Sequence, residues 1–218
     1  MNKAFIFDMD GVIIDSEAKW GPHEKKFLSE LLGKEVYEKI KDHLMGSTTN
    51  VIYDLARANG SNISKEAFLN AYDKQAFYIY SLSTPTNDIN KLLQKLKDLN
   101  FKIGLVTSSR GVWMDEVLKK IRNRELFDYT LSLAEREDLH SKPSPDGYLE
   151  AMKVLDASPE KTIILEDSNK GVTSAKASGG FTICLREHLA NDYISEGADM
   201  YIKNLKTLLT FLDELNFS

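Results

Sequence analysis

The sequence has 218 residues, of which 42% are hydrophobic and 28% charged, values that fit an ordinary globular protein and exclude a disordered or fibrous chain. Its formal net charge of −5 is small, and lysines and acids are mixed along the chain, which argues against nucleic acid or an anionic membrane as a partner. The length allows one α/β domain, or a modest core with an insert, and either could bury a substantial interior.

The first predicted element is a buried strand at residues 4–7, which runs directly into Asp8 and Asp10. Between residues 16 and 84 the pattern changes, because amphipathic segments recur and no convincing strand appears. This block is therefore predicted to be a helical insert, followed by a hinge at residues 83–86. Its aromatic side chains are expected to form the insert's own core: Phe68, Tyr72, Phe77, Tyr78 and Tyr80.

After the insert, short apolar runs rich in β-forming residues alternate with stretches of helical period. The runs that predict strands are residues 103–106, 129–133, 162–165, 181–185 and 200–202. One helix is predicted from Ile89 to Leu99, entered through Thr86 and Asn87 and closed by Asn100. The alternation predicts the α/β class, with a parallel sheet covered by helices on both faces.

Polar residues follow the ends of three predicted strands, and a lysine lies in the loop after a fourth. They are Asp8 and Asp10, then Thr107, Ser108 and Ser109, then Glu166 and Asp167, with Lys142 as the lysine. In an open parallel sheet, ligands bind outside the carboxyl ends of the strands, so these residues should converge on one crevice. Taken singly, each has an ordinary explanation as a turn residue, a helix cap or a solvated lysine. Together they are typical of a phosphate and metal site.

The charges of this cluster require a cation. Asp8, Asp167 and a phosphate dianion would together carry about four negative charges, and each pair of unit charges 4 Å apart costs about 4 kcal/mol at an effective dielectric constant near 20. Lys142 alone cannot offset several such pairs. A donor set made only of oxygen atoms is typical of Mg²⁺, which is therefore the predicted cofactor.

Four motifs occur in order along the chain, each at the end of a predicted strand or in a loop beside it. They are DMDGV at residues 8–12, VTSS at 106–109, SKPSPD at 141–146 and ILEDSNKGVTSAKASG at 164–179. The set resembles the haloacid dehalogenase superfamily in its phosphotransferase branch. The resemblance implies a Rossmann-like catalytic core, residues 1–15 and 85–218, with a four-helix cap, residues 16–84, inserted after the first strand. Within the superfamily the chain looks most like the sugar-phosphate phosphatases and β-phosphoglucomutases.

The resemblance implies a catalytic role for four residues. Asp8 would be the nucleophile, giving an aspartyl phosphate that water then hydrolyses, and Asp10 the general acid and base. Thr107 would hydrogen-bond a phosphoryl oxygen, and Lys142 would balance the charge on Asp8 and the phosphoryl group. An acid at position 10 indicates phosphoryl transfer, because true dehalogenases lack one there.

The same resemblance implies the metal and substrate contacts. Asp8, the Asp10 carbonyl and Asp167 would bind Mg²⁺, and Glu166 would act through a bound water or orient another ligand. The start of the helix after VTSS would add to the anion site through its free amides. The candidate substrate contacts are Ser108, Ser109, Arg110 and Trp20. Arg110 could equally be a solvated residue at the helix start, and Trp20 could equally pack inside the cap.

A mutase must hold a second phosphate away from the metal, which requires basic groups from the cap. β-Phosphoglucomutases carry a His where this chain has Trp20 and an Arg where it has Thr49. Because neither residue supplies a positive charge, the sequence favours a phosphatase. We therefore expect a Mg²⁺-dependent phosphatase of a small phosphorylated metabolite, a sugar phosphate. A phosphoglucomutase-type mutase and a non-catalytic regulatory relative are the alternatives.

The sequence also indicates where the protein works. The first apolar run is too short for a signal peptide, and no run is long enough to span a bilayer. The lone Cys184 cannot form an internal disulfide, which fits a reducing compartment. We therefore expect a cytoplasmic protein that acts as a monomer.

Overall fold

A six-stranded parallel sheet forms the centre of the structure, a computed structural model that describes residues 1–44, 47–189 and 196–214. The strands are β1 (Asn2–Phe7), β2 (Phe101–Thr107), β3 (Tyr129–Ser132), β4 (Ala157–Glu166), β5 (Phe181–Leu185) and β6 (Met200–Ile202). Their order across the sheet is β3-β2-β1-β4-β5-β6, and each neighbouring pair is parallel. The strand that ends at the first motif therefore lies between those that end at VTSS and at ILED.

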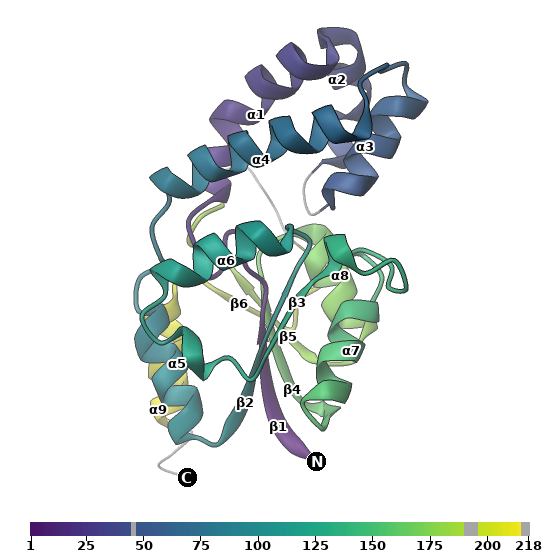
Figure 1. The fold of residues 1–218 in the computed structure, drawn as a ribbon. Helices are drawn as coiled ribbons and strands as arrows, with labels where there is room; N and C mark the ends of the chain where they lie inside the picture. The colour runs from purple at the N-terminus through teal and green to yellow at the C-terminus, as the bar shows by residue number, and fades with distance from the viewer. Residues whose placement is uncertain (45–46, 190–195, 215–218) are drawn as a thin grey trace.

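Helices cover both faces of this sheet, as Figure 1 shows. On one side are α5 (Ile89–Asp98) and α9 (Leu205–Glu214), and on the other α7 (Asp146–Val154) and α8 (Asn169–Ala177). The side chains of β1 alternate between these layers, because Phe5 and Phe7 belong to one buried apolar cluster and Ala4 and Ile6 to another. All four are fully buried. The α/β class and the parallel sheet are confirmed.

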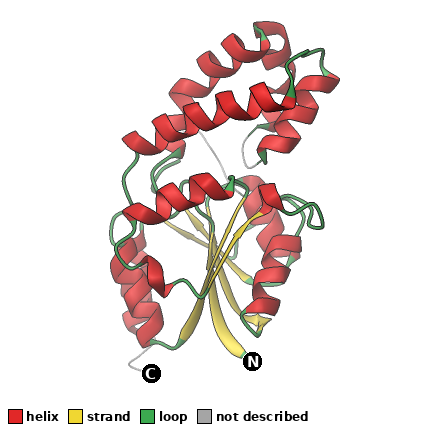
Figure 2. Ribbon diagram, in the orientation of Figure 1, coloured by secondary structure: helices red, strands yellow, loops and turns green. Residues whose placement is uncertain are grey.

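The segment between β1 and α5 folds into helices among the residues that the structure describes. They are α1 (Glu17–Leu32), α2 (Lys34–Ile40), the short 3-10 helix η1 (Lys41–His43), α3 (Thr49–Ala58) and α4 (Lys65–Leu82). Figure 2 shows that this helical layer stands over the end of the sheet opposite the chain termini. The predicted four-helix insert after the first strand is therefore present. Its division from the core as a cap domain, with boundaries at residues 16 and 84, stays a prediction.

Part of the aromatic prediction for the insert is wrong. Phe68, Tyr72 and Tyr80 are buried in α4, as expected, but Phe77 and Tyr78 are 43% and 50% exposed. The reason is the helical period: Phe77 and Tyr78 lie between the buried positions 76, 79 and 80 and therefore outside the buried face of α4. Tyr78 still contacts α1, where its ring centroid lies 5.8 Å from that of His23. Only the aromatic side chains on one face of α4 are therefore part of the core.

Several element boundaries also differ from the sequence prediction: β1 begins at Asn2, β2 spans Phe101–Thr107 and β3 ends at Ser132. β4 begins at Ala157, five residues before the predicted start, and a register shift lies beside it where β1 pairs first with Ala157 and then with Thr162. The helix predicted from Ile89 ends at Asp98, and Asn100 after it has a φ of 61°, as expected for a residue that closes a helix. Within the described part of the chain, no helix is both long and apolar enough to cross a membrane.

Candidate active site

The predicted polar residues meet at the carboxyl ends of the central strands. Asp8 follows β1 directly, and its amide continues the ladder by donating to the Leu165 carbonyl of β4 at 2.9 Å. Thr107 and Glu166 are the last residues of β2 and β4. The strand order makes these three ends neighbours, so side chains that are far apart in the sequence face one crevice.

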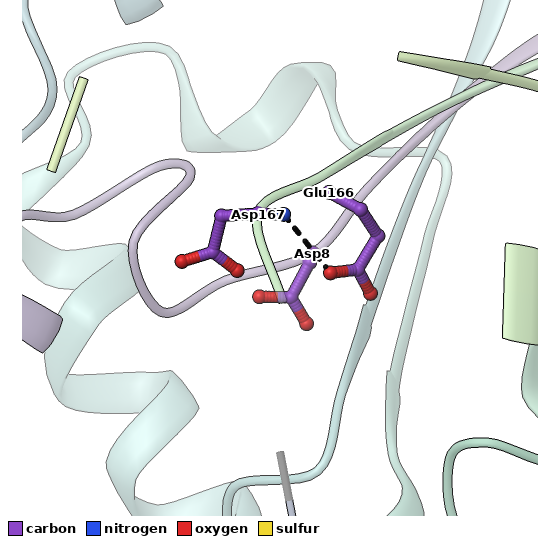
Figure 3. Close-up of side chains that lie close together, drawn as sticks. All are labelled: Asp8, Glu166 and Asp167. Carbon is purple, nitrogen blue, oxygen red and sulfur yellow. Dashed lines mark hydrogen bonds between the residues drawn. The ribbon is translucent and has the colours of Figure 1, made fainter. Parts of the chain in front are cut away.

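Three carboxylates form a buried cluster at this point. Asp8, Glu166 and Asp167 each offer an oxygen, and these oxygens all lie within 4.8 Å of one another. Figure 3 shows the three side chains together. The three residues are between 0% and 8% exposed. Burial raises the pKa of Asp8 to about 8, against the opposing charge of Lys142, and it raises the pKa of Asp167 well above its usual range. An all-oxygen set with excess negative charge fits a hard divalent cation.

Lys142 lies inside the cluster, where it touches two of the acids. Its ammonium donates to Asp8 Oδ1 at 2.5 Å, to Glu166 Oε1 at 2.6 Å and to the Val106 carbonyl at 3.2 Å. Burial alone would lower the pKa of Lys142, but the two carboxylates raise it well above its ordinary value. The loop lysine is therefore a buried, charged group, and the solvated alternative is wrong.

Glu166 is held by several donors at once. Besides Lys142, its Oε1 accepts from the Tyr148 hydroxyl, and its Oε2 accepts from the Asp167 amide at 3.1 Å and the Ser168 hydroxyl at 3.4 Å. Tyr148, a residue of α7, is itself fully buried. The carboxylate that is most deeply buried in the cluster is therefore also the one whose orientation is most strictly fixed.

Gly171 of α8 gives the Glu166 carboxylate its space. A Cβ at this position would lie 2.0 Å from the Glu166 carboxyl carbon, a distance that no side chain tolerates. We expect Gly171→Ala to displace Glu166, and Lys142 with it, and to lower the free energy of unfolding by about 1–3 kcal/mol. Urea unfolding measures this loss. Thr173→Ala, an exposed change in the same helix, is the control, and equal stability of the two variants would contradict the assignment.

Asp10 faces a different set of partners. Its Oδ1 accepts hydrogen bonds from the Ser16 hydroxyl at 2.6 Å and the Tyr80 hydroxyl at 2.9 Å, and its Oδ2 accepts from the Ser109 hydroxyl at 2.6 Å. Ser109, predicted as a substrate contact, is thus engaged with Asp10 in this structure. The contact of Tyr80 with Asp10 was not predicted from the sequence. Seventy positions separate the two residues, and no local pattern connects them.

The other predicted contacts with the phosphoryl group or the substrate include Thr107, Ser108 and Arg110. Thr107 is 1% exposed and its hydroxyl accepts from the Ser109 amide at 3.0 Å, while Ser108 lies between them in the loop before α6 (Gly111–Lys120). Arg110 precedes α6 and donates to both carboxylate oxygens of Asp73 in α4 at 2.5 Å. It is therefore paired with the insert, and the solvated alternative is wrong.

Trp20 packs within the helical layer. It is partly buried against the apolar cluster that includes Leu28, and its ring centroid lies 6.0 Å from that of Tyr72. This contact confirms the alternative in which Trp20 packs inside the cap. It leaves the stacking of a substrate on the same ring as a prediction.

A further acid from α1 reaches the site. A Cβ on Gly11 would lie 1.9 Å from Asp167 Oδ2 and 3.1 Å from Cγ of Glu17, so the two side chains flank one glycine whose φ of 74° few other residues adopt. Burial and then the nearby Asp10 charge raise the pKa of Glu17 to about 8. Glu17 belongs to the stretch DSEAKW, and its place at the start of the predicted helical insert, soon after the first motif, was the signal that could have found it.

The raised pKa values predict how stability depends on pH in the metal-free protein. Asp8 and Glu17 have a pKa of about 8 and Glu24 of about 7 in the folded state, against 3.8 to 4.5 ordinarily. The folded protein therefore retains protons that the unfolded chain releases, so this stabilisation is complete below about pH 4 and is lost as the pH approaches 8. His188, whose pKa burial lowers, acts in the opposite direction, and we expect the three carboxyl groups to dominate.

Urea unfolding in the presence of a chelator, at intervals from pH 5 to pH 8, measures this dependence. We expect the free energy of unfolding to fall across the interval and Glu24→Gln to flatten the slope. A stability that is constant or that rises over the interval in the unmodified protein would contradict the prediction.

Comparison with known proteins adds to this geometry. A family model described as "Haloacid dehalogenase-like hydrolase" matches residues 5–185. The chain belongs to this family. The match confirms the resemblance that the four motifs indicated. It also confirms the expectation that this haloacid dehalogenase-like hydrolase is an enzyme.

Several relatives of this hydrolase carry names that state an activity. The chain is 29% identical over 191 residues to a β-phosphoglucomutase of Bacillus subtilis, covering 83% of this chain and 82% of the relative. It is 28% identical over 193 residues to a phosphorylated carbohydrates phosphatase of Thermotoga maritima, covering 87% and 88%. Among solved structures, CbbY of Rhodobacter sphaeroides in complex with phosphate superposes with a TM-score of 0.75 at 21% identity, covering 98% of this chain and all of that one. The structural match supports the fold.

Proposed function

We propose that this hydrolase is a Mg²⁺-dependent phosphatase that hydrolyses a small sugar phosphate through an aspartyl phosphate on Asp8. The observation that carries the proposal is the buried convergence of Asp8, Glu166 and Asp167 around the ammonium of Lys142. Such a site attracts a cation and, with it, a phosphate. The names of the relatives, which include phosphatases of phosphorylated carbohydrates, support the substrate class.

Asp8 and Asp10 have different roles in the proposed reaction. In the first step an oxygen of Asp8 forms a bond to phosphorus while the bond to the leaving alcohol breaks, and Asp10 gives its proton to the alcohol oxygen. In the second step water attacks phosphorus, Asp10 takes its proton, and the bond from phosphorus to Asp8 breaks. Thr107, whose oxygen accepts from the Ser109 amide, keeps its own proton to donate to a phosphoryl oxygen.

The metal ligands follow from the cluster. Asp8, Asp167 and the backbone carbonyl of Asp10 would hold Mg²⁺, which would offset the charge of the phosphoryl group when bound. Glu166 is saturated by donors on both oxygens, and we assign it to the orientation of Lys142. Lys142 in turn holds Asp8 in place and neutralises part of its charge.

The helical insert would select the substrate by closing over the sheet edge and excluding water. The described residues of the insert favour a phosphatase over a mutase, because Trp20 and Thr49 carry no charge. The nearby Arg110 of the core is already paired with Asp73 of the insert. Glu17, an acid on the same side, supplies no positive charge either. None of these residues offers an unpaired positive charge to a second phosphate. We propose that the enzyme acts in the cytoplasm as a monomer.

Incubation with Mg²⁺ and a panel of sugar phosphates, followed by phosphorus NMR, tests the proposal. The panel includes β-glucose 1-phosphate because the relatives include a β-phosphoglucomutase. Free phosphate that depends on Mg²⁺ is the expected product. Conversion of the 1-phosphate to a 6-phosphate would instead establish the mutase, and absence of turnover across the panel would favour the regulatory alternative.

A further inference from the structure

The carboxylate of Asp10 is held by hydroxyl groups from three separate segments. Ser16 comes from the start of the insert, Tyr80 from the last turn of α4 and Ser109 from the loop after β2. A carboxylate has about four acceptor positions, two on each oxygen. Ser16 and Tyr80 both use Oδ1, and Ser109 uses Oδ2, so the position that remains for a proton is on Oδ2.

Tyr80 is fixed independently of any ligand. Its side chain is 1% exposed, and its ring lies against Trp113 of α6, with 6.4 Å between the ring centroids. The carbonyl groups of Tyr80 and Ser83, at the end of α4, accept hydrogen bonds from the ammonium of Lys120, also in α6. The phenol therefore reaches Asp10 from a helix end that the core holds in place, and its burial keeps it away from a substrate.

Asp73 of α4 makes a second set of contacts with α6 and with the residue before it. Asp73, two turns before Tyr80 in α4, accepts from the Arg110 guanidinium and from the Trp113 indole at 2.7 Å. Arg110 directly follows Ser109, the donor to Asp10 Oδ2. The packing of α4 on α6 thus places two of the three hydroxyl groups around Asp10.

We infer that Tyr80 is a positioning residue that orients Asp10 for proton transfer through Oδ2. The inference rests on the proposed role of Asp10 as general acid and base. The Tyr80 hydroxyl donates to Oδ1, restricts the rotation of the carboxyl group and leaves Oδ2 as the oxygen that can carry the transferred proton. Because Tyr80 touches neither the phosphoryl group nor the sugar, its contribution belongs to kcat and not to substrate binding.

The test is a double-mutant cycle between Tyr80→Phe and Asp10→Asn, with steady-state kinetics on the best substrate of the panel. Tyr80→Phe keeps the ring in its packing and removes the hydroxyl. We expect kcat to fall on the order of 10- to 100-fold, the size of one hydrogen bond to a charged group, with KM changed less than about twofold. In the Asp10→Asn background the same change should cost less than about twofold, because the group through which Tyr80 acts is gone.

Tyr78→Phe is the matched control, since Tyr78 lies in the same helix, is 50% exposed and should leave kcat unchanged. Thermal melting of each variant separates loss of fold from loss of orientation. Ser109→Ala removes the donor to the other oxygen and provides a second variant, although its hydroxyl also lies 3.4 Å from that of Tyr80. Equal losses from Tyr80→Phe in both backgrounds, or a raised KM with unchanged kcat, would overturn the inference and leave the proposed function standing. Absence of turnover by the unmodified protein would overturn the proposed function and the inference together.

Discussion

Asp8→Asn is expected to lower phosphate release on the order of 10⁴-fold or more while leaving the fold intact. The amide has nearly the shape of the carboxylate, but its oxygen carries no full charge to attack phosphorus, and its nitrogen cannot accept from Lys142. The loss should therefore be in kcat, for every substrate of the panel. Phosphate release under saturating substrate and Mg²⁺ measures it.

The control for this variant is Asp115→Asn, which makes the same chemical change at an exposed position of α6. It should retain full activity. If Asp8→Asn kept more than about a tenth of the activity, another group would be the nucleophile, because no amide substitutes for a carboxylate at that rate.

Lys142→Met should have the largest effect on stability. The Lys142 side chain is 2% exposed, and its removal leaves the buried Glu166 carboxylate without a cation and Asp8 without its hydrogen-bond donor. Breaking a buried ion pair from one side costs about 3–5 kcal/mol, since the remaining charge is uncompensated. Methionine fills a similar volume, so the loss reports the charge and not a cavity.

Urea unfolding of the metal-free variant at neutral pH measures this cost. Lys153→Met is the matched control, because Lys153 is 82% exposed and its change should alter the free energy of unfolding by less than about 0.5 kcal/mol. Equal unfolding midpoints for the two variants would show that Lys142 does not neutralise the cluster.

The centre of the site could be predicted from the sequence because it depends on topology. Asp8, Thr107 and Glu166 each end or follow a buried parallel strand, and parallel strands bring their carboxyl ends to one edge of the sheet. The position of Lys142 followed from the same argument. Its burial did not, since a loop lysine in a sequence gives no sign of the acids that surround it.

The contacts of the insert could not be predicted in the same way. The Tyr80 hydroxyl meets Asp10, and Asp73 meets Arg110, only because α4 packs on α6, and the helical period in α4 does not specify which core helix it will meet. Phe77 and Tyr78 illustrate the same limit. An aromatic run indicates a packed helix, but the neighbours decide which of its rings are covered.

The central claim is that Asp8 carries the phosphoryl group during turnover. Rapid acid quenching of the enzyme with Mg²⁺ and saturating substrate, followed by mass spectrometry of the peptide that contains residues 4–19, tests it most directly. We predict a phosphoryl group on Asp8 in the unmodified enzyme and none in Asp8→Asn. A phosphoryl group on another side chain, or quenched enzyme that releases phosphate with Asp8 unmodified at every time point, would contradict the account.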